Sequence, residues 1–490
     1  MSTLSRVVKN TIVLYIAKGL SFLITFFYVM YSARYLGPTN YGIISLALAY
    51  AGVFSILADF GIQKLTIREI AREKETIQSY ITNIALMKII LALITYALLA
   101  TIVYMMSYPV ETMQVVWILG VTVVFSSFTQ FLNAIFQSFE RMELQAAGQV
   151  LNAIVMAIGV FCAVHFSWSV LLFAALYAST SFLIMVYSCI TTFWVLHHKI
   201  IRPIADVKSI DWALWKHIMR NAWPIGIVSV IGIVYFKIDV LMLQAFKGAT
   251  EVGLYSAAHQ LMELTYIIPE IIITALFPLM SRYYVNSALS LNKIYKTLFK
   301  YFLVISSLIA LLVTLLGDQI IGTIYGVKFV NSTGLLKILI WSTIPIYIST
   351  VMASMYIIAN KQRPYLILQI SLLFVNVLLN LVLIPAYSNV GASVAKIICA
   401  SVELIINFVI FTRFGYKIQW KTEFVPILVC FVVVLLSTTI LLQQNINTYI
   451  ISGIAIVVYS ALILKLCFTQ DDVSLIKRIL LILLPTSKKQ

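Results

Sequence analysis

The feature that most constrains this chain is a succession of apolar blocks, each about 20 residues long, that runs through nearly the whole sequence. A helix of that length spans the hydrocarbon core of a bilayer, because an α-helix rises ~1.5 Å per residue. Hydrophobic residues make up 62% of the 490 residues and charged residues 11%, whereas a soluble domain carries ~25% charged residues. The sequence therefore predicts an all-α polytopic membrane protein.

Fourteen such blocks can be counted, and we expect each to form one transmembrane helix. The expected spans are residues 11–33, 42–62, 79–107, 113–138, 145–166, 169–195, 221–245, 252–278, 301–324, 333–359, 365–386, 390–412, 424–442 and 448–467.

The distribution of basic residues predicts the topology. The formal net charge is +16, but with the N-terminus placed in the cytoplasm only Arg34, Lys247 and Lys328 fall in outside loops. This bias follows the positive-inside rule, and it predicts a multi-pass protein of the cytoplasmic (inner) membrane with both termini in the cytoplasm. Because topology explains the basic charge, we expect no nucleic-acid partner.

Sequence motifs of common enzymes are absent. The chain has no Walker A pattern, no GxSxG and no HExxH, and its five cysteines show no metal-ligand spacing. We therefore expect a transporter rather than an enzyme, without ATP hydrolysis, a metal or a cofactor.

The chain also partly repeats itself. With a shift of 211 residues, GPTNYGIISLA from Gly37 lies over GATEVGLYSAA from Gly248, and Asp59 lies over Glu270. Both copies start from the same side of the membrane, so the sequence predicts two parallel six-helix pseudo-repeats around a central cavity, where transporters place their sites. Two further helices follow at the C-terminus. Chance identity between apolar segments is the alternative.

The repeat and the loop lengths predict five parts of the chain. They are an N-terminal six-helix lobe (1–195), a cytoplasmic linker with a short interfacial helix (196–220), a C-terminal six-helix lobe (221–421), two additional transmembrane helices (422–468) and a cytoplasmic amphipathic tail (469–490). Ser209 or Asp211 would cap the interfacial helix.

Several expected spans carry a seam of polar residues at helical spacing. In KGLSFLITFFYVMYSARYLG, residues 18–37, Lys18 and Thr25 are seven apart and share one face. Lipid cannot satisfy polar groups, so such a face must meet protein or water. Seams in both halves favour a hydrated cavity over hydrogen bonds between neighbouring helices, which would explain any single seam. The seam residues that we expect to bind substrate in the cavity are Lys18, Thr25, Asn133, Gln149, Gln369 and Asn376.

Ionisable residues within the spans are further candidates, because a charge near the centre of a membrane helix costs ~2.5–3.5 kcal/mol. The cations that could bind an anionic substrate are Lys18, Arg34, Lys237 and Lys396. The carboxylates that could relay protons or hold a cation are Asp59, Asp239, Glu263, Glu270 and Glu403. A buried structural ion pair is the alternative for the residues deep in a span, and Lys18 could extend its side chain to the membrane interface. Glu270 also follows Pro269, which lacks a backbone donor and can open the helix.

The stretch ARYLGPTNYGIISLA, at the first outside loop, resembles the signature of the polysaccharide (O-antigen, Wzx-type) flippases of the multidrug/oligosaccharidyl-lipid/polysaccharide exporter (MOP) superfamily. Three later stretches are similar to successive segments of the same family: ADFGIQKLTIREIAR, YFKIDVLMLQAFKGATEVGLYSAA and LNLVLIPAYSNVGASVAKIICASVE. The likeness covers nearly the whole chain. It implies two six-helix lobes around a central cavity, with two extra helices at the C-terminus.

The resemblance also implies a function. It implies translocation of an undecaprenyl-pyrophosphate-linked oligosaccharide, such as an O-antigen (lipopolysaccharide), capsule or exopolysaccharide repeat unit, from the cytoplasmic to the outer leaflet by alternating access. A proton or sodium ion would drive the transport, and a polymerase and a chain-length regulator of a polysaccharide assembly complex are candidate partners. Arg34, Asp239 and the turn between Gly37 and Gly42 are the positions carried over.

Three other functions remain open at this point. They are a small-molecule or drug cation antiporter of the same superfamily, a membrane-embedded polysaccharide-assembly enzyme, and a scaffold in an assembly complex. The two additional C-terminal spans favour the flippase over the antiporter, and the absence of a large outside loop disfavours a polymerase.

Overall fold

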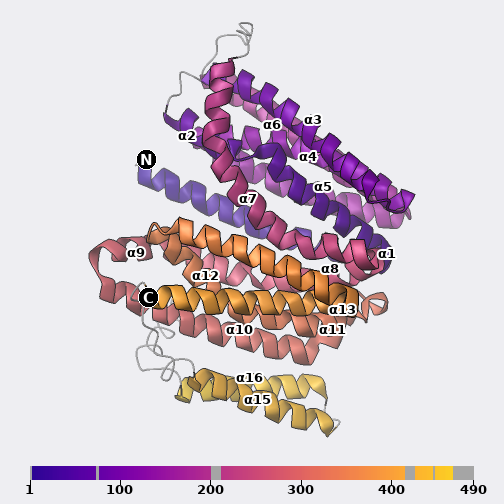
Figure 1. Ribbon diagram of the computed structural model, residues 1–490, viewed down its shortest axis with the longest axis vertical. Helices are drawn as coiled ribbons and strands as arrows, with labels where there is room; N and C mark the ends of the chain where they lie inside the picture. The colour runs from indigo at the N-terminus through magenta and orange to yellow at the C-terminus, as the bar shows by residue number, and fades with distance from the viewer. Residues whose placement is uncertain (1–2, 73–76, 200–210, 414–424, 445–446, 467–490) are drawn as a thin grey trace, which may run out of the picture. The chain divides into compact units, whose positions relative to one another are not determined.

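The computed structural model describes residues 3–72, 77–199, 211–413, 425–444 and 447–466 (Figure 1). All regular elements in these ranges are helices, and no strand occurs there. The expectation of an all-α chain is therefore confirmed. The expected cytoplasmic tail, residues 469–490, lies outside the described residues.

Eleven of the described helices are long and apolar enough to cross a membrane. Two of them, Ala17–Asp59 and Gln362–Arg413, each contain two of the expected spans, and Val425–Thr438 is a shorter apolar helix. These helices account for the fourteen spans expected from the sequence. The protein is a multi-pass membrane protein.

The chain forms two compact units. Unit 1 comprises Met1–Ala257, Ile324–Phe329 and Leu373–Ala392, and unit 2 comprises Ala258–Thr323, Val330–Leu372 and Ser393–Gln490. Because these units do not coincide with the two lobes expected from the repeat, the lobe boundaries and the cavity between the lobes stay predictions.

Unit 1 is built mainly from the first seven helices. They are α1 (Thr3–Asp59), α2 (Ile62–Arg72), α3 (Ile77–Met105), α4 (Val110–Ser138), α5 (Met142–His165), α6 (Val170–Lys199) and α7 (Trp212–Lys247), followed by the first turns of α8 (Ala249–Thr265). The helix α1 packs against α4, α5 and α7, and α4 packs against α6. A short 3-10 helix, η2 (Val327–Phe329), also belongs to this unit, with the ring of Phe329 against that of Tyr41.

The start of α7 is anchored by polar contacts and by apolar packing. The Asp211 carboxylate accepts a hydrogen bond from the Leu214 N–H at 3.0 Å and so caps the helix. Ile218 is buried in a cluster with apolar residues of α2, α3 and α4. Residues 212–220 are the first turns of α7, which continues to Lys247. The interfacial position expected for this segment stays a prediction. Ser209, the other expected cap, lies outside the described residues.

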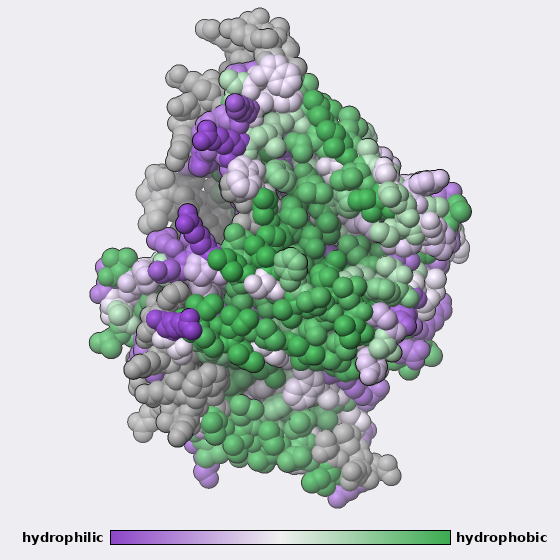
Figure 2. Space-filling model, viewed as in Figure 1, coloured by the Kyte–Doolittle hydropathy of each residue, from purple (hydrophilic) through white to green (hydrophobic). Residues whose placement is uncertain are grey.

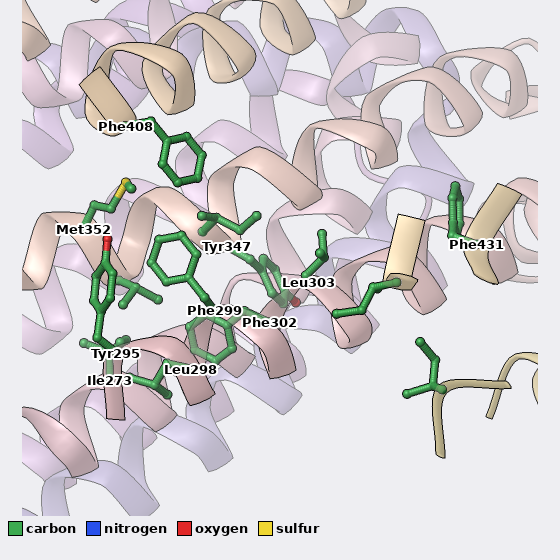
Figure 3. Packing of buried hydrophobic residues seen from close by; sticks show 14 of the residues in the cluster. Ile273, Tyr295, Leu298, Phe299, Phe302, Leu303, Tyr347, Met352, Phe408 and Phe431 are labelled. Atoms are coloured by element: carbon green, nitrogen blue, oxygen red, sulfur yellow. The ribbon is translucent and has the colours of Figure 1, made fainter. Parts of the chain in front are cut away.

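Unit 2 holds the remaining helices. They are the end of α8, then α9 (Ile267–Asn286), α10 (Ala288–Ile324), α11 (Ser332–Leu339), η3 (Ile340–Ser342), α12 (Thr343–Ile358), the two ends of α13 (Gln362–Arg413), α15 (Val425–Gln443) and α16 (Thr448–Leu466). The middle of α13, Leu373–Ala392, belongs to unit 1. Its core is rich in aromatic residues, as Figure 3 shows. The ring centroid of Phe299 lies 5.9 Å from that of Phe408, and the centroid of Phe302 lies 5.8 Å from that of Tyr347.

Apolar side chains also cover much of the outside of the molecule. On the visible face of each unit hydrophobic residues predominate, and hydrophilic residues gather toward the ends of the helices (Figure 2). Phe27 of α1 and Ile94 of α3, for example, are 60% and 62% exposed. Such a surface is stable in contact with lipid, whereas contact with water would be unfavourable.

The backbone itself shows the sequence repeat. Gly37 has φ 73° and ψ 174°, and Gly248, 211 residues later, has φ 87° and ψ 179°. Only glycine adopts this conformation without strain, and each of the two glycines directly precedes a helical segment. Glu140 and Asn360, 220 residues apart, form a second pair, with φ of 58° and 54°.

Equivalent residues of the repeat also contact each other within unit 1. The hydroxyl oxygens of Thr39 and Thr250 are 2.9 Å apart. Beside them, Gly42 and Gly253 approach so closely that a Cβ atom added to either would lie 1.8 Å from a backbone carbonyl oxygen of the other helix. The two copies of the motif therefore pack against each other through glycine surfaces.

The break between α8 and α9 lies at Tyr266, three residues before Pro269. Pro269 has no N–H to donate to the carbonyl of Thr265. The hydroxyl of Tyr347 donates to that carbonyl instead, at 2.5 Å. The helix opening expected from Pro269 is thus confirmed.

The kink within α13 lies at Ser388, where φ is 53° and ψ is −135°. Two side chains of α7 and α8 hold it in unit 1. The Lys247 ammonium donates to the Pro385 carbonyl at 2.8 Å, and the Ser388 hydroxyl donates to Glu251 at 2.9 Å. The eleventh and twelfth expected spans meet at this kink.

Candidate functional site

Three helices of unit 1 line a polar cavity of about 240 Å³. The residues that line it are Ser126, Thr129, Gln130 and Asn133 of α4, Gln145, Gly148, Gln149 and Asn152 of α5, and Ser181, Ile184 and Ser188 of α6. On each helix most of these positions are three, four or seven residues apart, so that one face of each helix points into the cavity.

Most amide groups of the cavity have no partner in the protein. The Gln145 side-chain oxygen accepts a hydrogen bond from the Gln137 amide at 2.9 Å. Among the described residues, no protein partner exists for the side-chain amides of Gln130, Asn133, Gln149 and Asn152. An unsatisfied amide is costly within a membrane, so these groups require water or a polar ligand.

The structure thus brings together two of the residues predicted to bind substrate, Asn133 and Gln149. They come from the polar seams of the fourth and fifth expected spans, and those seams face each other across the cavity. The contribution of α6 was missed in the sequence. Ser181 and Ser188 are seven residues apart and would have shown the same seam.

Three predicted residues of α1 lie outside this cavity. Lys18 and Arg34 are exposed, and Thr25 is half-buried and hydrogen-bonded to Tyr28. A Cβ atom on Gly326 would lie 3.7 Å from the Arg34 guanidinium, which places that guanidinium next to the loop before η2. The two cations are thus accessible to an anionic group.

Asp239 of α7 lies in a buried polar cluster of unit 1. Its carboxylate is 1% exposed, and it accepts hydrogen bonds from the Asn380 amide at 2.7 Å and from the Tyr255 hydroxyl at 3.2 Å. The same Asn380 amide donates to the side-chain oxygen of Asn376 at 2.9 Å. Asn376, predicted to line a cavity with Asn133, is fully buried in this cluster instead.

Lys237 lies two residues before Asp239 on α7 and is half-buried. Residues two apart on a helix point to different faces, as the sequence predicts for this pair. Of the Asp239 cluster, Tyr255 could not be identified from the sequence, because its place beside α7 depends on how α8 packs. The cluster itself combines one carboxylate with two amides, and small hard cations prefer oxygen ligands of this kind.

Asp59, at the end of α1, pairs with Lys88 of α3. The ammonium of Lys88 is fully buried and the carboxylate of Asp59 is 14% exposed. Asp59 also accepts a hydrogen bond from the Gln63 N–H at 3.2 Å, at the start of α2. Through these contacts Asp59 ties the end of α1 to α3 and to the start of α2.

In unit 2, Glu263 and Glu270 have different surroundings. The carboxylate of Glu263 lies 3.5 Å from Nδ1 of His259, one turn earlier on α8. Glu270 is exposed in the first turn of α9. The break at Tyr266 separates the two carboxylates.

Gln369 and Glu403 meet within α13, on either side of the kink. The Gln369 amide donates to the Glu403 carboxylate at 3.1 Å. Lys396 is buried, at 2% exposure, two turns before Glu403. Gln369 corresponds to Gln149 in the repeat. The amide of Gln149 has no protein partner among the described residues, whereas the amide of Gln369 is bonded to the Glu403 carboxylate.

The sequence matches a known family over more than half of its length. The family model described as polysaccharide biosynthesis protein matches residues 7–284. The probable low-salt glycan biosynthesis flippase Agl15 of Haloferax volcanii is 24% identical over 428 residues, which cover 81% of this chain and 82% of that protein. The capsular polysaccharide biosynthesis protein CapF of Staphylococcus aureus is 20% identical over 415 residues, covering 83% of this chain and 99% of that protein.

Solved structures share the fold at lower identity. The inward closed conformation of the lipid II flippase MurJ aligns with a TM-score of 0.71 at 14% identity, covering 96% of this chain and 100% of that one. An inward-facing multidrug resistance MATE family transporter of the MOP superfamily aligns with a TM-score of 0.64 at 16% identity, covering 80% and 94%. With the family match these likenesses confirm the resemblance drawn from the sequence, and the chain belongs to the polysaccharide biosynthesis protein family, with the fold of the MOP transporters.

Proposed function

We propose that this protein is a flippase that moves an undecaprenyl-pyrophosphate-linked oligosaccharide from the cytoplasmic to the outer leaflet. The cargo would be an O-antigen, capsule or exopolysaccharide repeat unit. The observation that carries this proposal is the cavity between α4, α5 and α6. Four of its five side-chain amides lack a protein partner among the described residues, although they lie in apolar helices. A glycan needs such a lining, because its hydroxyls lose their hydrogen bonds to water when it crosses the membrane. Polar side chains of the protein can replace those bonds.

The family and the relatives support this assignment. The names of Agl15 and CapF connect those two proteins with glycan and capsular polysaccharide biosynthesis, and Agl15 is named a probable flippase. The uncharged cavity argues against a drug cation antiporter, in which an anionic group would balance the charge of the cation.

The pyrophosphate of the cargo requires cations. We assign this role to Arg34 and Lys18, which are exposed, and to Lys237, which is half-buried. Lys396 is buried near Glu403, so its charge is already compensated within unit 2. The lipid tail would remain in the bilayer while the headgroup crosses.

We assign ion coupling to Asp239. Its buried carboxylate and the side-chain oxygen of Asn376 lie together, because both accept hydrogen bonds from the Asn380 amide. A proton or a sodium ion bound there would neutralise the carboxylate and change the hydrogen bonds between α7 and α13. Alternating access would be coupled to the ion in this way, in a cytoplasmic membrane with both termini inside, as the positive-inside rule predicts. A polymerase and a chain-length regulator remain candidate partners.

The test is transport in vesicles that contain the purified protein and an undecaprenyl-pyrophosphate-linked oligosaccharide. We expect the glycan to become accessible to a glycosidase on the opposite side, and the double variant Lys237→Ala/Glu263→Ala to lower the rate at least tenfold. Lys64→Ala, an exposed residue of α2, serves as the matched control and should keep the wild-type rate. Transport of an organic cation without movement of the lipid-linked glycan would contradict the proposal and favour the antiporter.

A further inference from the structure

We propose that the cavity between α4, α5 and α6 is a subsite for one electrically neutral sugar residue, and that it rejects phosphate groups and acidic sugars. This inference rests on the proposed flippase function and specifies which part of the cargo the cavity holds. It follows from the charge, the hydrogen-bonding capacity and the size of the cavity.

The first argument is the absence of charge. None of the residues that line the cavity is acidic or basic. On α4 and α5 the acidic and basic residues are Glu111, Glu143 and His165, all in the first or last turn. Glu143 is moreover paired with Arg141. An anionic group placed in the cavity would therefore lose its hydration without gaining a cation, which is unfavourable in a membrane.

The second argument is the matching of donors and acceptors. Each carboxamide offers two N–H donors and one carbonyl acceptor, and each sugar hydroxyl can both donate and accept. Thr129 and Ser126 donate their own hydroxyl protons to backbone carbonyls at 3.0 and 3.2 Å, so their oxygens remain as acceptors. A ring that carries several hydroxyls satisfies the four partnerless amides better than an apolar or a charged ligand of the same size.

The third argument is size. The cavity measures about 240 Å³, below the ~300–1,000 Å³ that is usual for pockets holding drug-sized ligands. It suits a single sugar ring and not a whole repeat unit. The remaining sugars and the pyrophosphate must therefore lie elsewhere.

The fourth argument comes from the repeat. Gln149 of the cavity corresponds to Gln369 of unit 2, and there the amide donates to Glu403 at 3.1 Å. The second copy thus carries a carboxylate where the first copy is uncharged. The two copies therefore differ in charge. Of the two equivalent glutamines, Gln149 has an amide that can bind a ligand, whereas the amide of Gln369 is already bonded to Glu403.

The experiment is saturation-transfer difference NMR on the full-length protein in lipid nanodiscs. The neutral probes are the methyl glycosides of glucose, galactose, N-acetylglucosamine and rhamnose, and the acidic probe is methyl glucuronide at pH 7. We expect saturation transfer to at least one neutral glycoside and none to the glucuronide, with no displacement by inorganic pyrophosphate. The double variant Asn133→Leu/Gln149→Leu should lower the signal at least fivefold, while Gln114→Leu, an exposed position of α4 outside the cavity, should preserve it.

Four results would each overturn the inference: no neutral glycoside binds, the glucuronide binds equally well, pyrophosphate displaces the sugar, or the double leucine variant binds like the wild type. The vesicle assay separates this failure from a failure of the flippase assignment. A protein that moves the lipid-linked glycan but binds no neutral glycoside in the cavity refutes only the subsite. A protein that binds the glycosides in the cavity but moves no lipid-linked glycan refutes only the flippase.

Discussion

At the scale of single residues, the crossing of α1 and α8 leaves no room for a side chain. A Cβ atom on Gly42 would lie 1.8 Å from the carbonyl oxygen of Ala249 and 2.8 Å from the nitrogen of Gly253. These are backbone atoms, which cannot turn aside as a side chain can. The helices would have to separate, and the contact between Thr39 and Thr250 would be lost with them.

We therefore expect Gly42→Ala to lower the free energy of unfolding by about 1–3 kcal/mol or more, as overpacking does elsewhere. The measurement is thermal unfolding in detergent, followed by size-exclusion chromatography. Gly52→Ala is the matched control on the same helix, because no atom lies within 4 Å of its added Cβ. The control should be neutral or slightly stabilising, since alanine favours helix more than glycine does. Equal stability of the two variants would contradict the close crossing.

The buried ion pair between Asp59 and Lys88 carries a second prediction at this scale. Asp59→Asn leaves the fully buried ammonium of Lys88 without its carboxylate, which should cost about 3–5 kcal/mol of unfolding free energy. The double variant Asp59→Asn/Lys88→Met removes both charges and should recover most of that loss, measured by thermal unfolding.

The control for this prediction is the exposed pair of Lys337 and Asp318, whose side chains are 33% and 65% exposed. Asp318→Asn should change the stability by no more than about 1 kcal/mol, because water screens that pair. If the double variant at Asp59 and Lys88 is no more stable than Asp59→Asn, the unpaired charge of Lys88 is not the cause of the lost stability.

At the scale of elements, one asparagine joins α3 to the start of α7. The side-chain oxygen of Asn83 accepts hydrogen bonds from the Asp211 N–H at 2.9 Å and from the Trp215 indole N–H at 3.0 Å. Asn83 is itself buried, at 3% exposure. The first turn of α7 is therefore held to α3 through one acceptor.

We expect Asn83→Ala to destabilise the protein by about 1–3 kcal/mol, the usual cost of leaving a buried donor unpaired. Thermal unfolding measures the loss, and limited proteolysis within residues 196–215 should become faster. Asn331→Ala is the comparison, because Asn331 precedes α11 without a side-chain capping bond. Equal effects of the two substitutions would show that the two bonds to Asn83 do not anchor α7.

The sequence predicts elements well where hydropathy decides them. Apolar length identifies the membrane helices, and the shift of 211 residues anticipates the matching φ angles of Gly37 and Gly248. The continuity of α7 could not be predicted, because it depends on Ile218 being buried against three other helices. Nor does apolar length show how the first two spans are joined, because a single non-helical residue, Gly37, separates them.

At the scale of the whole molecule, the polar residues found in the sequence separate into different environments. Asn133 and Gln149 line one cavity, because two polar seams on neighbouring helices meet there. Asn376 belongs to a buried cluster around Asp239, and Gln369 is bonded to Glu403. A seam shows which face of a helix needs partners, but not whether water or another side chain will provide them.

The proposed ion coupling would involve the whole molecule, and it leads to a further prediction. In vesicles that contain the lipid-linked glycan, a proton or a sodium gradient should raise the rate of transport severalfold over the rate without a gradient. Asp239→Asn removes the charge that an ion would neutralise, so the stimulation should vanish while glycoside binding in the cavity persists. If neither gradient changes the rate, or if Asp239→Asn retains the stimulation, the coupling role of Asp239 is excluded.

The contact between Thr39 and Thr250 sets equivalent positions of the repeat against each other. The two residues occupy the same place in the two copies of the motif, so each touches its own counterpart. A residue meets its own counterpart at the rotation axis of a symmetric homodimer. The crossing thus has the local geometry of a two-fold interface, but both of its sides belong to one chain. A substitution therefore changes only one of the two equivalent positions, which a symmetric dimer does not allow.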